Sequence, residues 1–370
     1  MLEAVRGGTS RHVADLVRAA AGCEHHVALP PTHQEAGASG AVVDTASVEA
    51  MAGHGAVVHR VDMRRSACHP ANLVAAVALS ALVRRVGPAV VHGHSSVGGA
   101  LARGAGRAAG LPVVYTPNGL ATGRVAVRIE RLLSHLTTAL IASSASEAEL
   151  AVGLGLIGGD RVRVIPNGID LSPTVPDHVP DLRARLGLAA GTPLVGTVAR
   201  LVEQKAPEEF VRVCAEVARR RADVHGLLVG MGPLAGAVDR AVASHGLEAR
   251  LHRIAHLDRA DTVLGQLDVF VLASRFEGGP YTPLEAMRAG VPVVLSDVVG
   301  NRDAVVAGRS GILCPFGDPA AMAGAVVGLL SPDGPRVQMV AEAHRRLADH
   351  FDVAEMGRRV ADLYAEVTST

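Results

Sequence analysis

The feature that most constrains the fold of this sequence is an alternation of short β-branched runs with longer stretches of helical periodicity. The alternation occurs in two series that a proline-containing stretch separates. This pattern predicts parallel sheets with helical connections, the doubly wound α/β class. The strand candidates are residues 2–5, 26–29, 56–61, 89–94, 112–116, 139–143 and 162–167 in the first series, and 194–200, 225–230, 251–256, 269–274 and 292–297 in the second.

The two series predict two domains, since 370 residues exceed what one ordinary hydrophobic core accommodates. The stretch between them, residues 170–193, contains four prolines and no sustained apolar period. We expect a first domain over residues 1–172, a linker over 173–185 and a second domain over 186–350. A final helix within residues 351–370 is expected to pack back on the first domain. Open α/β sheets bind ligands beyond the carboxyl ends of their strands, so an active site is expected between the domains.

Charge and cysteine usage narrow the function classes. The formal net charge is zero, which argues against a nucleic-acid binder that neutralises phosphates. The cysteines are far apart and form no Cys-x-x-Cys pair or Cys/His cluster, which favours reduced side chains in a cytoplasmic protein. The start has no basic segment followed by an apolar one, and the longest apolar run, residues 73–83, is shorter than the ~20 residues of a membrane span.

Residues 274–297 carry the strongest chemical pattern. A strand ends at Ser274, a Gly-Gly-Pro loop follows, and Thr282-Pro283-Leu284-Glu285 opens a helix that Gly290 closes. The free N–H groups of a helix start preceded by glycines bind phosphate oxygens. Glu277 and Glu285 then bracket the anion and accept hydrogen bonds from sugar hydroxyls. Alternatively, Glu277 is an ordinary loop carboxylate, and Thr282 and Glu285 form a capping box.

Two carboxylates beside a phosphate require cations, and the loop after residues 194–200 offers Arg200 and Lys205. Lys205 is the only lysine among the 36 Lys and Arg residues. A compact ammonium on a flexible stem can follow a leaving phosphate, whereas the rigid guanidinium fork suits a static bidentate contact. The alternative is a surface lysine in a chain that otherwise uses arginine.

Several motifs in fixed order resemble the retaining glycosyltransferases of family 4. They are Arg200-x4-Lys205, Gly-Met-Gly-Pro-Leu at 230–234, Glu277-x7-Glu285 with its following helix, residues 164–170 and residues 308–326. The resemblance implies the GT-B fold, in which two Rossmann-like domains face each other across a cleft. It also implies a nucleotide-sugar donor, for which we expect a UDP-sugar, and the roles that follow.

On the donor side, the resemblance gives Arg200 and Lys205 the diphosphate, Glu277 the sugar and Glu285 the ribose hydroxyls. This ribose role competes with the capping box and is the favoured one. The remaining donor-binding residues that the resemblance implies are Gly8, Gly230, Arg253, Ile254, Gly278, Gly279, Pro280, Tyr281 and Thr282.

On the acceptor side, Gly7 and Gly8 resemble the family's N-terminal loop, and this Gly-Gly is no GxGxxG dinucleotide motif. His92 and His94 stand at the carboxyl end of a strand, where His94 is either a core or a functional residue. Asn118 stands where the family often has histidine; it can recognise a hydroxyl but carries no titrating proton. The catalytic candidates are thus Glu277, Arg200, Lys205, His94 and Asn118, and the acceptor candidates are Gly7, Gly8, His92, His94 and Asn118.

The expected reaction moves a sugar with retention to a hydroxyl of a small molecule, a glycan or a lipid-linked acceptor, in polysaccharide or natural-product biosynthesis. No Asp-x-Asp pair and no His/Asp cluster with metal spacing occurs, so we expect no essential metal or cofactor. Two alternatives stay open: a nucleotide-sugar epimerase of GT-B fold, and a non-enzymatic nucleotide-sugar-binding protein, toward which Asn118 is the one hint.

Residues 123–137 place Arg124, Arg128 and Arg131 at helical spacing. Such a pattern is either a solvated helix face or a weak peripheral contact with the inner face of a membrane, serving a lipid-linked acceptor.

Overall fold

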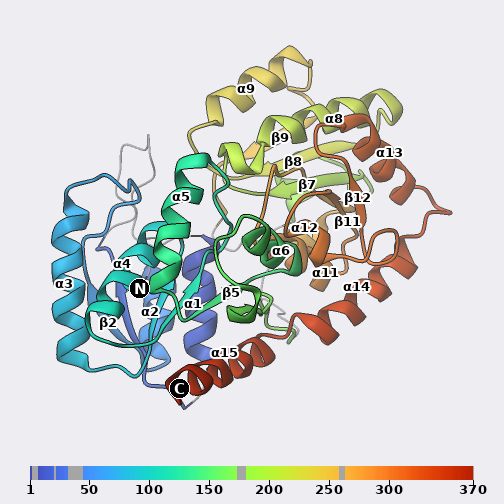
Figure 1. Ribbon diagram of the computed structural model, residues 1–370. Coiled ribbons are helices and arrows are strands. Elements are labelled where there is room, and N and C mark those ends of the chain that lie inside the picture. Colours follow the sequence, from blue (N-terminus) through green and yellow to red (C-terminus); the bar gives the residue numbers. More distant parts are fainter. Residues whose placement is uncertain (2–6, 21, 32–44, 173–180, 258–262, 370) are drawn as a thin grey trace. The chain divides into compact units, whose positions relative to one another are not determined.

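The computed structural model describes residues 1, 7–20, 22–31, 45–172, 181–257 and 263–369. Its contacts divide the chain into two compact units (Figure 1). Unit 1 comprises Met1–Asp170 with Asp352–Thr370, and unit 2 comprises Leu171–Phe351. The first strand candidate, residues 2–5, lies outside the described residues.

Unit 1 contains parallel strands in a two-stranded sheet, β1-β2, and a four-stranded sheet, β3-β4-β5-β6. The strands are β1 His26–Leu29, β2 Val57–Arg60, β3 Val91–His94, β4 Val113–Thr116, β5 Ala139–Ala142 and β6 Val162–Val164. The helices are α1 Gly8–Ala19, α2 Thr45–Gly53, α3 Ala71–Val86, α4 Ser96–Ala108, α5 Arg124–Leu133, α6 Ala145–Gly153 and α15 Val353–Thr368. Each of these six strands of unit 1 lies inside a run that the sequence pattern marks, whereas β12 of unit 2, Ile312–Cys314, was not predicted.

The final helix, α15, belongs to unit 1 and packs against α1. Its buried residues Val353, Met356, Val360 and Leu363 join a core cluster with Leu16 of α1, Val114 of β4, Ile141 of β5 and Ile165, which follows β6. The approach is close, because a Cβ at Gly357 would overlap the backbone of Ala19. An apolar stripe at helical spacing thus explains why this segment returns to the first unit.

A buried ion pair joins α4 to α5 in unit 1. The side chain of Arg103 is 1% exposed, and its Nη1 and Nη2 lie 2.8 and 3.1 Å from the two carboxylate oxygens of Glu130. The guanidinium also lies over the ring of Tyr115, 4.0 Å from the centroid, and the Tyr115 hydroxyl donates to Glu130. Burial, and then the neighbouring Glu130, raise the pKa of Tyr115 well above its usual value.

Unit 2 is built on one parallel sheet in the order β12-β11-β10-β7-β8-β9. If β7 is numbered as the first strand, the order becomes 6-5-4-1-2-3, which is the strand order of a Rossmann-like domain. The strands are β7 Leu194–Val198, β8 His225–Val229, β9 Leu251–Ile254, β10 Val269–Leu272, β11 Val293–Ser296 and β12 Ile312–Cys314. The helices are α7 Leu182–Arg185, α8 Pro207–Arg220, α9 Ala235–Ser244, α11 Tyr281–Arg288, α12 Asn301–Ala304, α13 Pro319–Leu329 and α14 Arg336–His350.

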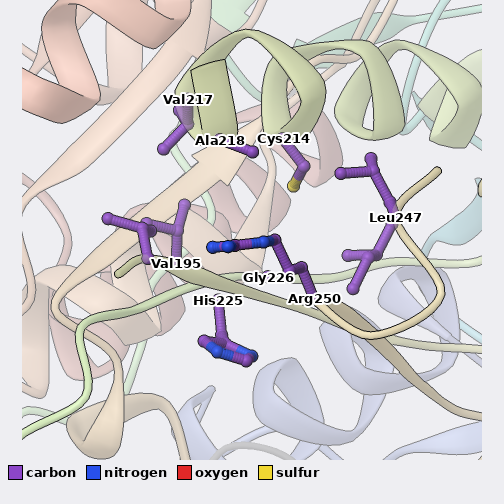
Figure 2. Close-up of a pocket in the computed structure, with 10 residues that line it drawn as sticks. Val195, Cys214, Val217, Ala218, His225, Gly226, Leu247 and Arg250 are labelled. Atoms are coloured by element: carbon purple, nitrogen blue, oxygen red, sulfur yellow. The ribbon is translucent and has the colours of Figure 1, made fainter. Parts of the chain in front are cut away.

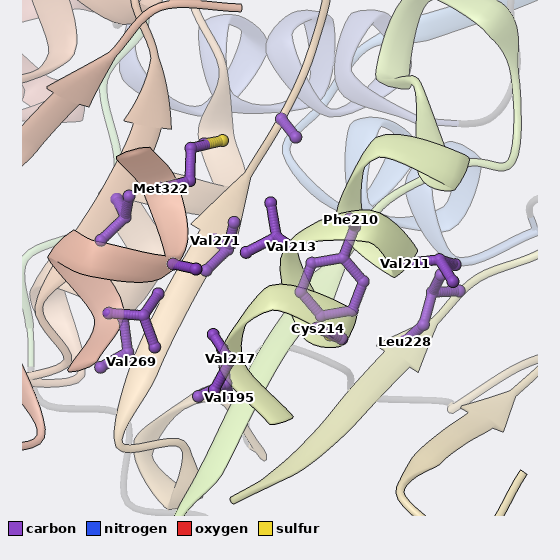
Figure 3. Packing of buried hydrophobic residues seen from close by; sticks show 14 of the residues in the cluster. Val195, Phe210, Val211, Val213, Cys214, Val217, Leu228, Val269, Val271 and Met322 are labelled. Carbon is purple, nitrogen blue, oxygen red and sulfur yellow. The ribbon is translucent and has the colours of Figure 1, made fainter. Parts of the chain in front are cut away.

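The core of unit 2 lies between this sheet and α8 and α13 (Figure 3). Phe210, Val213 and Val217 of α8 belong to one buried cluster with Val195 of β7 and Val271 of β10. Burying each such side chain stabilises the fold by about 1.5–3 kcal/mol relative to exposure.

Helix α7 falls in the expected linker, but its contacts assign it to unit 2. The amide of Leu182 donates to the Gln266 side chain at 2.8 Å, and Arg183 pairs with Asp268 at 2.7 Å. The proline spacing does not reveal these contacts, because both partners lie far along the chain.

Candidate active site

The segment from β10 to α11 forms the centre of the candidate site in unit 2. Helix α11 begins at Tyr281 with Pro280 as its N-cap, and no side chain caps it. The capping-box alternative for Thr282 and Glu285 is therefore wrong, because Thr282 already lies inside the helix. Glu285 is buried on this helix, and Gly290, with φ of +75°, follows its end as expected.

The start of α11 has the properties of an anion site. The first N–H groups of any helix have no acceptor inside the helix and carry the positive end of its dipole. The first turn of α11 holds no acidic residue. Gly278 and Gly279 precede it and lack side chains that would block a phosphate.

The backbone at Gly300 supports the loop that contains Glu277 and Gly278. It has φ of +83°, and a Cβ there would lie 2.7 Å from the carbonyl oxygen of Gly278 and 2.8 Å from that of Glu277. The amide of Glu277 donates to the carbonyl of Val299 at 3.1 Å. The 277–278 backbone therefore rests on the 299–300 backbone, a contact that only glycine permits.

Lys205 and Glu277 meet directly in this structure. The Lys205 Nζ lies 2.6 Å from Glu277 Oε1, and the two side chains are 15% and 4% exposed. The side-chain amide of Gln204 donates to the backbone carbonyl of Phe276 at 3.2 Å. The backbone carbonyl of Gln204 accepts from the backbone amide of Arg275 at 2.8 Å. Gln204 also donates weakly to Glu277 Oε2 at 3.4 Å, so the loop before α8 and the loop before α11 are joined by one ion pair and three hydrogen bonds.

The backbone beside Lys205 adopts an unusual conformation. Ala206, which follows it, has φ of +44° and forms the N-cap of α8, with Pro207 as the first helical residue. A left-handed conformation at a residue other than glycine costs about 1–2 kcal/mol. The same short segment carries the ammonium that reaches Glu277.

Arg200 follows β7 and lies in a segment that the Gly-Met-Gly loop supports. The amide of Leu201 donates to the carbonyl of Met231 at 2.8 Å. Gly230 and Gly232 have φ of +159° and +157°, and a Cβ at either would overlap the backbone at Ala199 or Leu201. Gly230 therefore positions the backbone next to Arg200.

Two further residues expected at the donor, Arg253 and Ile254, lie on β9. The guanidinium of Arg253 forms two hydrogen bonds with Asp239 of α9, at 2.7 and 2.9 Å. The carbonyl of Ile254 accepts from the amide of Gly230 at 2.9 Å. Ile254 is thus hydrogen-bonded to the Gly-Met-Gly loop, and the guanidinium of Arg253 is paired with a carboxylate of α9.

The sequence interpretation missed three buried polar residues near the candidate site: Ser274, Ser296 and Asn301. Ser296 donates to the carbonyl of Ser274 at 2.6 Å, and the Asn301 amide donates to the carbonyl of Ser296 at 3.0 Å. All three side chains are fully buried, at the carboxyl ends of β10 and β11 and the start of α12. Polar residues directly after apolar strands were the available signal, since buried polar groups require partners.

A small cavity lies at the other end of the same sheet (Figure 2). It is lined by Cys214, His225 and Arg250 together with aliphatic side chains, and the first residues of β8 and β9 border it. Only about 10 Å³ is open to a water-sized molecule, which corresponds to about one water. It cannot accommodate a nucleotide.

In unit 1, two of the expected acceptor residues, His92 and His94, belong to a cluster of histidines with His12. Gly7 has φ of +88° and precedes α1, which starts at Gly8. The ring centroids of His92 and His94 are 4.0 Å apart, and those of His12 and His94 are 5.3 Å apart. His92 is bonded through Nδ1 to the Tyr364 hydroxyl at 2.6 Å and through Nε2 to the Thr116 hydroxyl at 2.8 Å.

Burial keeps these rings neutral. It lowers the pKa of His12 to about 4, against a hydrogen bond with Asn167 that raises it. Burial, followed by the neighbouring positive groups, lowers the pKa of His92 and His94 well below the usual value. The buried Nδ1 of His94 has no hydrogen-bond partner among the described residues.

Asn118 lies in a tight turn after β4. It has φ of +56°, a left-handed conformation that asparagine tolerates. Its side-chain amide donates to the backbone carbonyl of Thr116 at 3.3 Å. The next residue, Gly119, has φ of +112° and donates its amide to Glu147 Oε1 at 2.8 Å. Asn118 therefore presents its side chain from a turn that Glu147 fixes.

Glu147 is a positioning residue that the sequence interpretation missed. Its second oxygen accepts from the amide of Ser143 at 2.8 Å, so it joins the loops after β4 and β5. Burial raises its pKa to about 6. Ser144 caps α6 by accepting from the Glu147 amide, and the Ser-x-x-Glu pattern of a helix start was the available signal.

We expect unit 1 to lose stability in acid. The folded state holds His12 with a pKa of about 4, below the unfolded value of 6.5, so the unfolded state binds protons more strongly. Stability therefore falls as pH drops from 6.5 to 4, by about 3 kcal/mol for His12 alone. Urea unfolding followed at several pH values measures this slope.

Glu147 acts in the opposite direction over part of this range. Its pKa is raised to about 6, so protonation near that pH favours the folded state, by about 2 kcal/mol at most. The histidines outweigh it, since the pKa values of His12, His92 and His94 are all lowered. The control is His12→Gln, whose stability should vary less with pH; an unchanged slope in this variant would contradict the assignment.

With the geometry in place, comparison with known proteins assigns the family. The family model described as Glycosyltransferase Family 4 matches residues 6–173, and the one described as Glycosyl transferases group 1 matches residues 192–332. D-inositol 3-phosphate glycosyltransferase of Frankia alni is 33% identical over 290 residues, which are 70% of each chain. The chain belongs to glycosyltransferase family 4.

Further similarities agree with this family. The UDP-Gal:alpha-D-GlcNAc-diphosphoundecaprenol alpha-1,3-galactosyltransferase of Escherichia coli is 28% identical over 305 residues, 79% of each chain. The crystal structure of Anabaena HepE in complex with UDP-glucose has a TM-score of 0.82 at 18% identity, covering 99% of this chain and 98% of that one. The similarity confirms the GT-B fold, and the family makes this chain a glycosyltransferase.

Proposed function

We propose that this family 4 enzyme transfers a sugar, with retention, from a UDP-sugar to a hydroxyl of a small-molecule, glycan or lipid-linked acceptor. The observation that carries the proposal is the Lys205–Glu277 ion pair, 2.6 Å long, next to the start of α11. In this loop cluster the cation and the helix start suit the diphosphate, which is also the leaving group, and the carboxylate suits the sugar hydroxyls.

Donor binding in this proposal exchanges partners at Lys205. The diphosphate takes the N–H groups at the start of α11 and the cations Arg200 and Lys205. Glu277 then accepts hydrogen bonds from sugar hydroxyls in place of the ammonium, and Glu285 accepts from the ribose. The two positive side chains neutralise the diphosphate, so the proposal requires no metal ion.

Transfer breaks the bond between the anomeric carbon and the phosphate oxygen and forms one to the acceptor oxygen on the same face. The acceptor hydroxyl gives its proton to the departing phosphate oxygen. Lys205 and Arg200 stabilise the negative charge that grows on the leaving group, which is the main electrostatic term in this proposal. Asn118 offers an amide donor and acceptor for hydroxyl recognition.

The printed names of relatives support the donor and the acceptor class. The E. coli relative uses UDP-Gal and a lipid-diphosphate acceptor, and the Frankia alni relative uses an inositol phosphate. The described residues include no helix that is long and apolar enough to cross a bilayer. The widely spaced cysteines favour reduced side chains, and on that ground we propose a cytoplasmic enzyme.

Ligand-induced stabilisation tests the donor proposal. UDP at about 100 times its Kd should stabilise the fold by about 2.7 kcal/mol and raise its Tm by about 5–10 °C, because it binds only the folded state. GDP, dTDP and ADP at the same concentration are the controls, and a larger shift with any of them would contradict the uridine assignment. Incubation of the UDP-sugar alone then separates the classes: slow hydrolysis indicates a transferase, an epimer indicates an epimerase, and an intact donor indicates a binding protein.

A further inference from the structure

Helix α3 in unit 1 exposes an apolar face. Leu73, Val74 and Val77 are 75%, 72% and 73% exposed, although the opposite side of the helix, with Leu79 and Val83, is buried. No charged residue occurs in α3 before Arg84 and Arg85 at its carboxyl end. Single exposed aliphatic residues are common on proteins, but three within two turns of one helix are not.

Helix α5 exposes a second apolar stripe. Val125, Ile129 and Leu132 follow one another at helical spacing and are 71%, 47% and 72% exposed. Arg124 and Arg128 lie beside them and are exposed as well. The buried contact of this helix is made by Val127 and by Glu130, which pairs with Arg103.

Both helices belong to one layer of unit 1. The strands β3, β4 and β5 are neighbours in that order, so right-handed crossovers place α4 and α5 on the same face of the sheet. Helix α3 packs against α4, and the Arg103–Glu130 pair joins α4 to α5. Figure 1 shows α4 between α3 and α5. The exposed residues Gly104 and Ala108 of α4 have no side chain or only a methyl group to project from the surface.

The charge of this layer has one sign. The charged residues of α3, α4 and α5 are Arg84, Arg85, Arg103, Arg107, Arg124, Arg128, Arg131 and Glu130. Glu130 is the single acid, and the buried Arg103 neutralises it. Every other charge in the layer is an exposed arginine, within a protein whose formal net charge is zero.

We infer that α3 and α5 form a docking surface for an anionic lipid bilayer. The surface comprises Leu73, Val74 and Val77 of α3, Val125, Ile129 and Leu132 of α5, and the arginines beside them. Aliphatic side chains enter the interface between head groups and acyl chains, while arginines contact the anionic head groups. Exposed aliphatic residues on helices whose exposed charges are all cationic match a bilayer of this charge.

Vesicle sedimentation tests this inference without nucleotide or acceptor, so its result does not depend on the proposed transfer. The full chain should bind vesicles of phosphatidylcholine with about one-third phosphatidylglycerol, and bind neutral vesicles far more weakly. Arg124→Ala with Arg128→Ala should weaken binding to anionic vesicles about 30-fold, since each arginine near the surface contributes about a factor of five. Arg240→Ala on α9 of unit 2 is the matched control and should bind as the unmodified chain does.

A second pair of variants tests the aliphatic residues. Val77→Glu with Leu132→Glu should reduce binding at least 100-fold, because two apolar side chains no longer enter the interface. Val337→Glu is the control, since Val337 is 82% exposed on α14 of unit 2. Thermal unfolding confirms that each variant is folded.

Three outcomes would overturn the inference. One is that the unmodified chain fails to bind anionic vesicles, and another is that Val337→Glu loses binding as strongly as the double variant does. The third is a dimer in solution that Val77→Glu with Leu132→Glu dissociates, because the surface would then bind a second copy of the chain.

Discussion

Replacement of Lys205 by alanine should lower kcat for sugar transfer by about 10²–10³-fold, while the Kd for the donor changes much less. The ammonium is placed 2.6 Å from Glu277, on a flexible stem in the loop before α8. Charge on the departing phosphate is larger in the transition state than in the bound donor, so a mobile cation contributes most at that stage. Single-turnover kinetics at saturating donor, with Kd from titration, separate the two effects.

Loss of stability must be separated from loss of catalysis in this variant. Lys205→Ala leaves the carboxylate of Glu277 4% exposed, with Gln204 as a weak donor 3.4 Å away, and an unsatisfied buried group costs about 1–3 kcal/mol or more. The double variant Lys205→Ala with Glu277→Gln removes that charge and should recover Tm without recovering kcat. Lys205→Arg should fold and keep part of the activity, because the charge is retained without the flexible ammonium.

The opposite kinetic result would contradict the proposed role. If Lys205→Ala raised the donor Kd and left kcat unchanged at saturation, Lys205 would bind the ground state and the transition state equally. A double-mutant cycle with Glu277→Gln then measures how strongly the two side chains act together, and an interaction free energy near zero would mean that the ion pair has no functional coupling.

The parts of the fold that depend on local periodicity were predictable from the sequence. The strands β7 to β11 lie within their predicted runs. Parallel strands that are buried on both faces consist of continuous aliphatic segments bounded by turns, and such segments are recognisable in the sequence. Thr282-Pro283 resembles a helix opening and predicts a start of α11 one to two residues late, whereas the helix begins at Tyr281 with Pro280 as its N-cap. Boundaries depend on the backbone at single residues, which periodicity does not specify.

Pairings between distant residues were not predictable in the same way. Lys205 and Glu277 were both assigned to the donor, yet their direct contact joins residues 72 positions apart. Glu147 joins two loops of unit 1 through backbone amides, and Arg253 pairs with Asp239. These contacts arise from the order of strands in a sheet and from which loops that order brings together, and a single sequence contains neither.

The buried pair of Arg103 and Glu130 gives the second large expected effect. Glu130→Ala should destabilise unit 1 by about 3–5 kcal/mol, because it leaves an uncompensated guanidinium whose side chain is 1% exposed. The cation–π contact with Tyr115 and the hydrogen bond from Nε to the Gly99 carbonyl remain, but neither neutralises the charge. Urea unfolding gives the free energy, and hydrogen exchange in residues 96–108 and 124–133 assigns the loss to α4 and α5.

Two further variants show whether charge is the cause. Glu355→Ala is the matched control, since its ion pair with Arg358 lies in the same unit with both side chains at least half exposed, and ion pairs in water contribute little to stability. Arg103→Met with Glu130→Leu removes both charges and fills similar volume, so it should recover most of the stability that Glu130→Ala loses. If this double variant were instead as unstable as Glu130→Ala, the packing of α4 on α5 would depend on the shape of the polar cluster and not on its charge. In that case Tyr115, whose hydroxyl donates to Glu130 at 3.2 Å, would be the next residue to test.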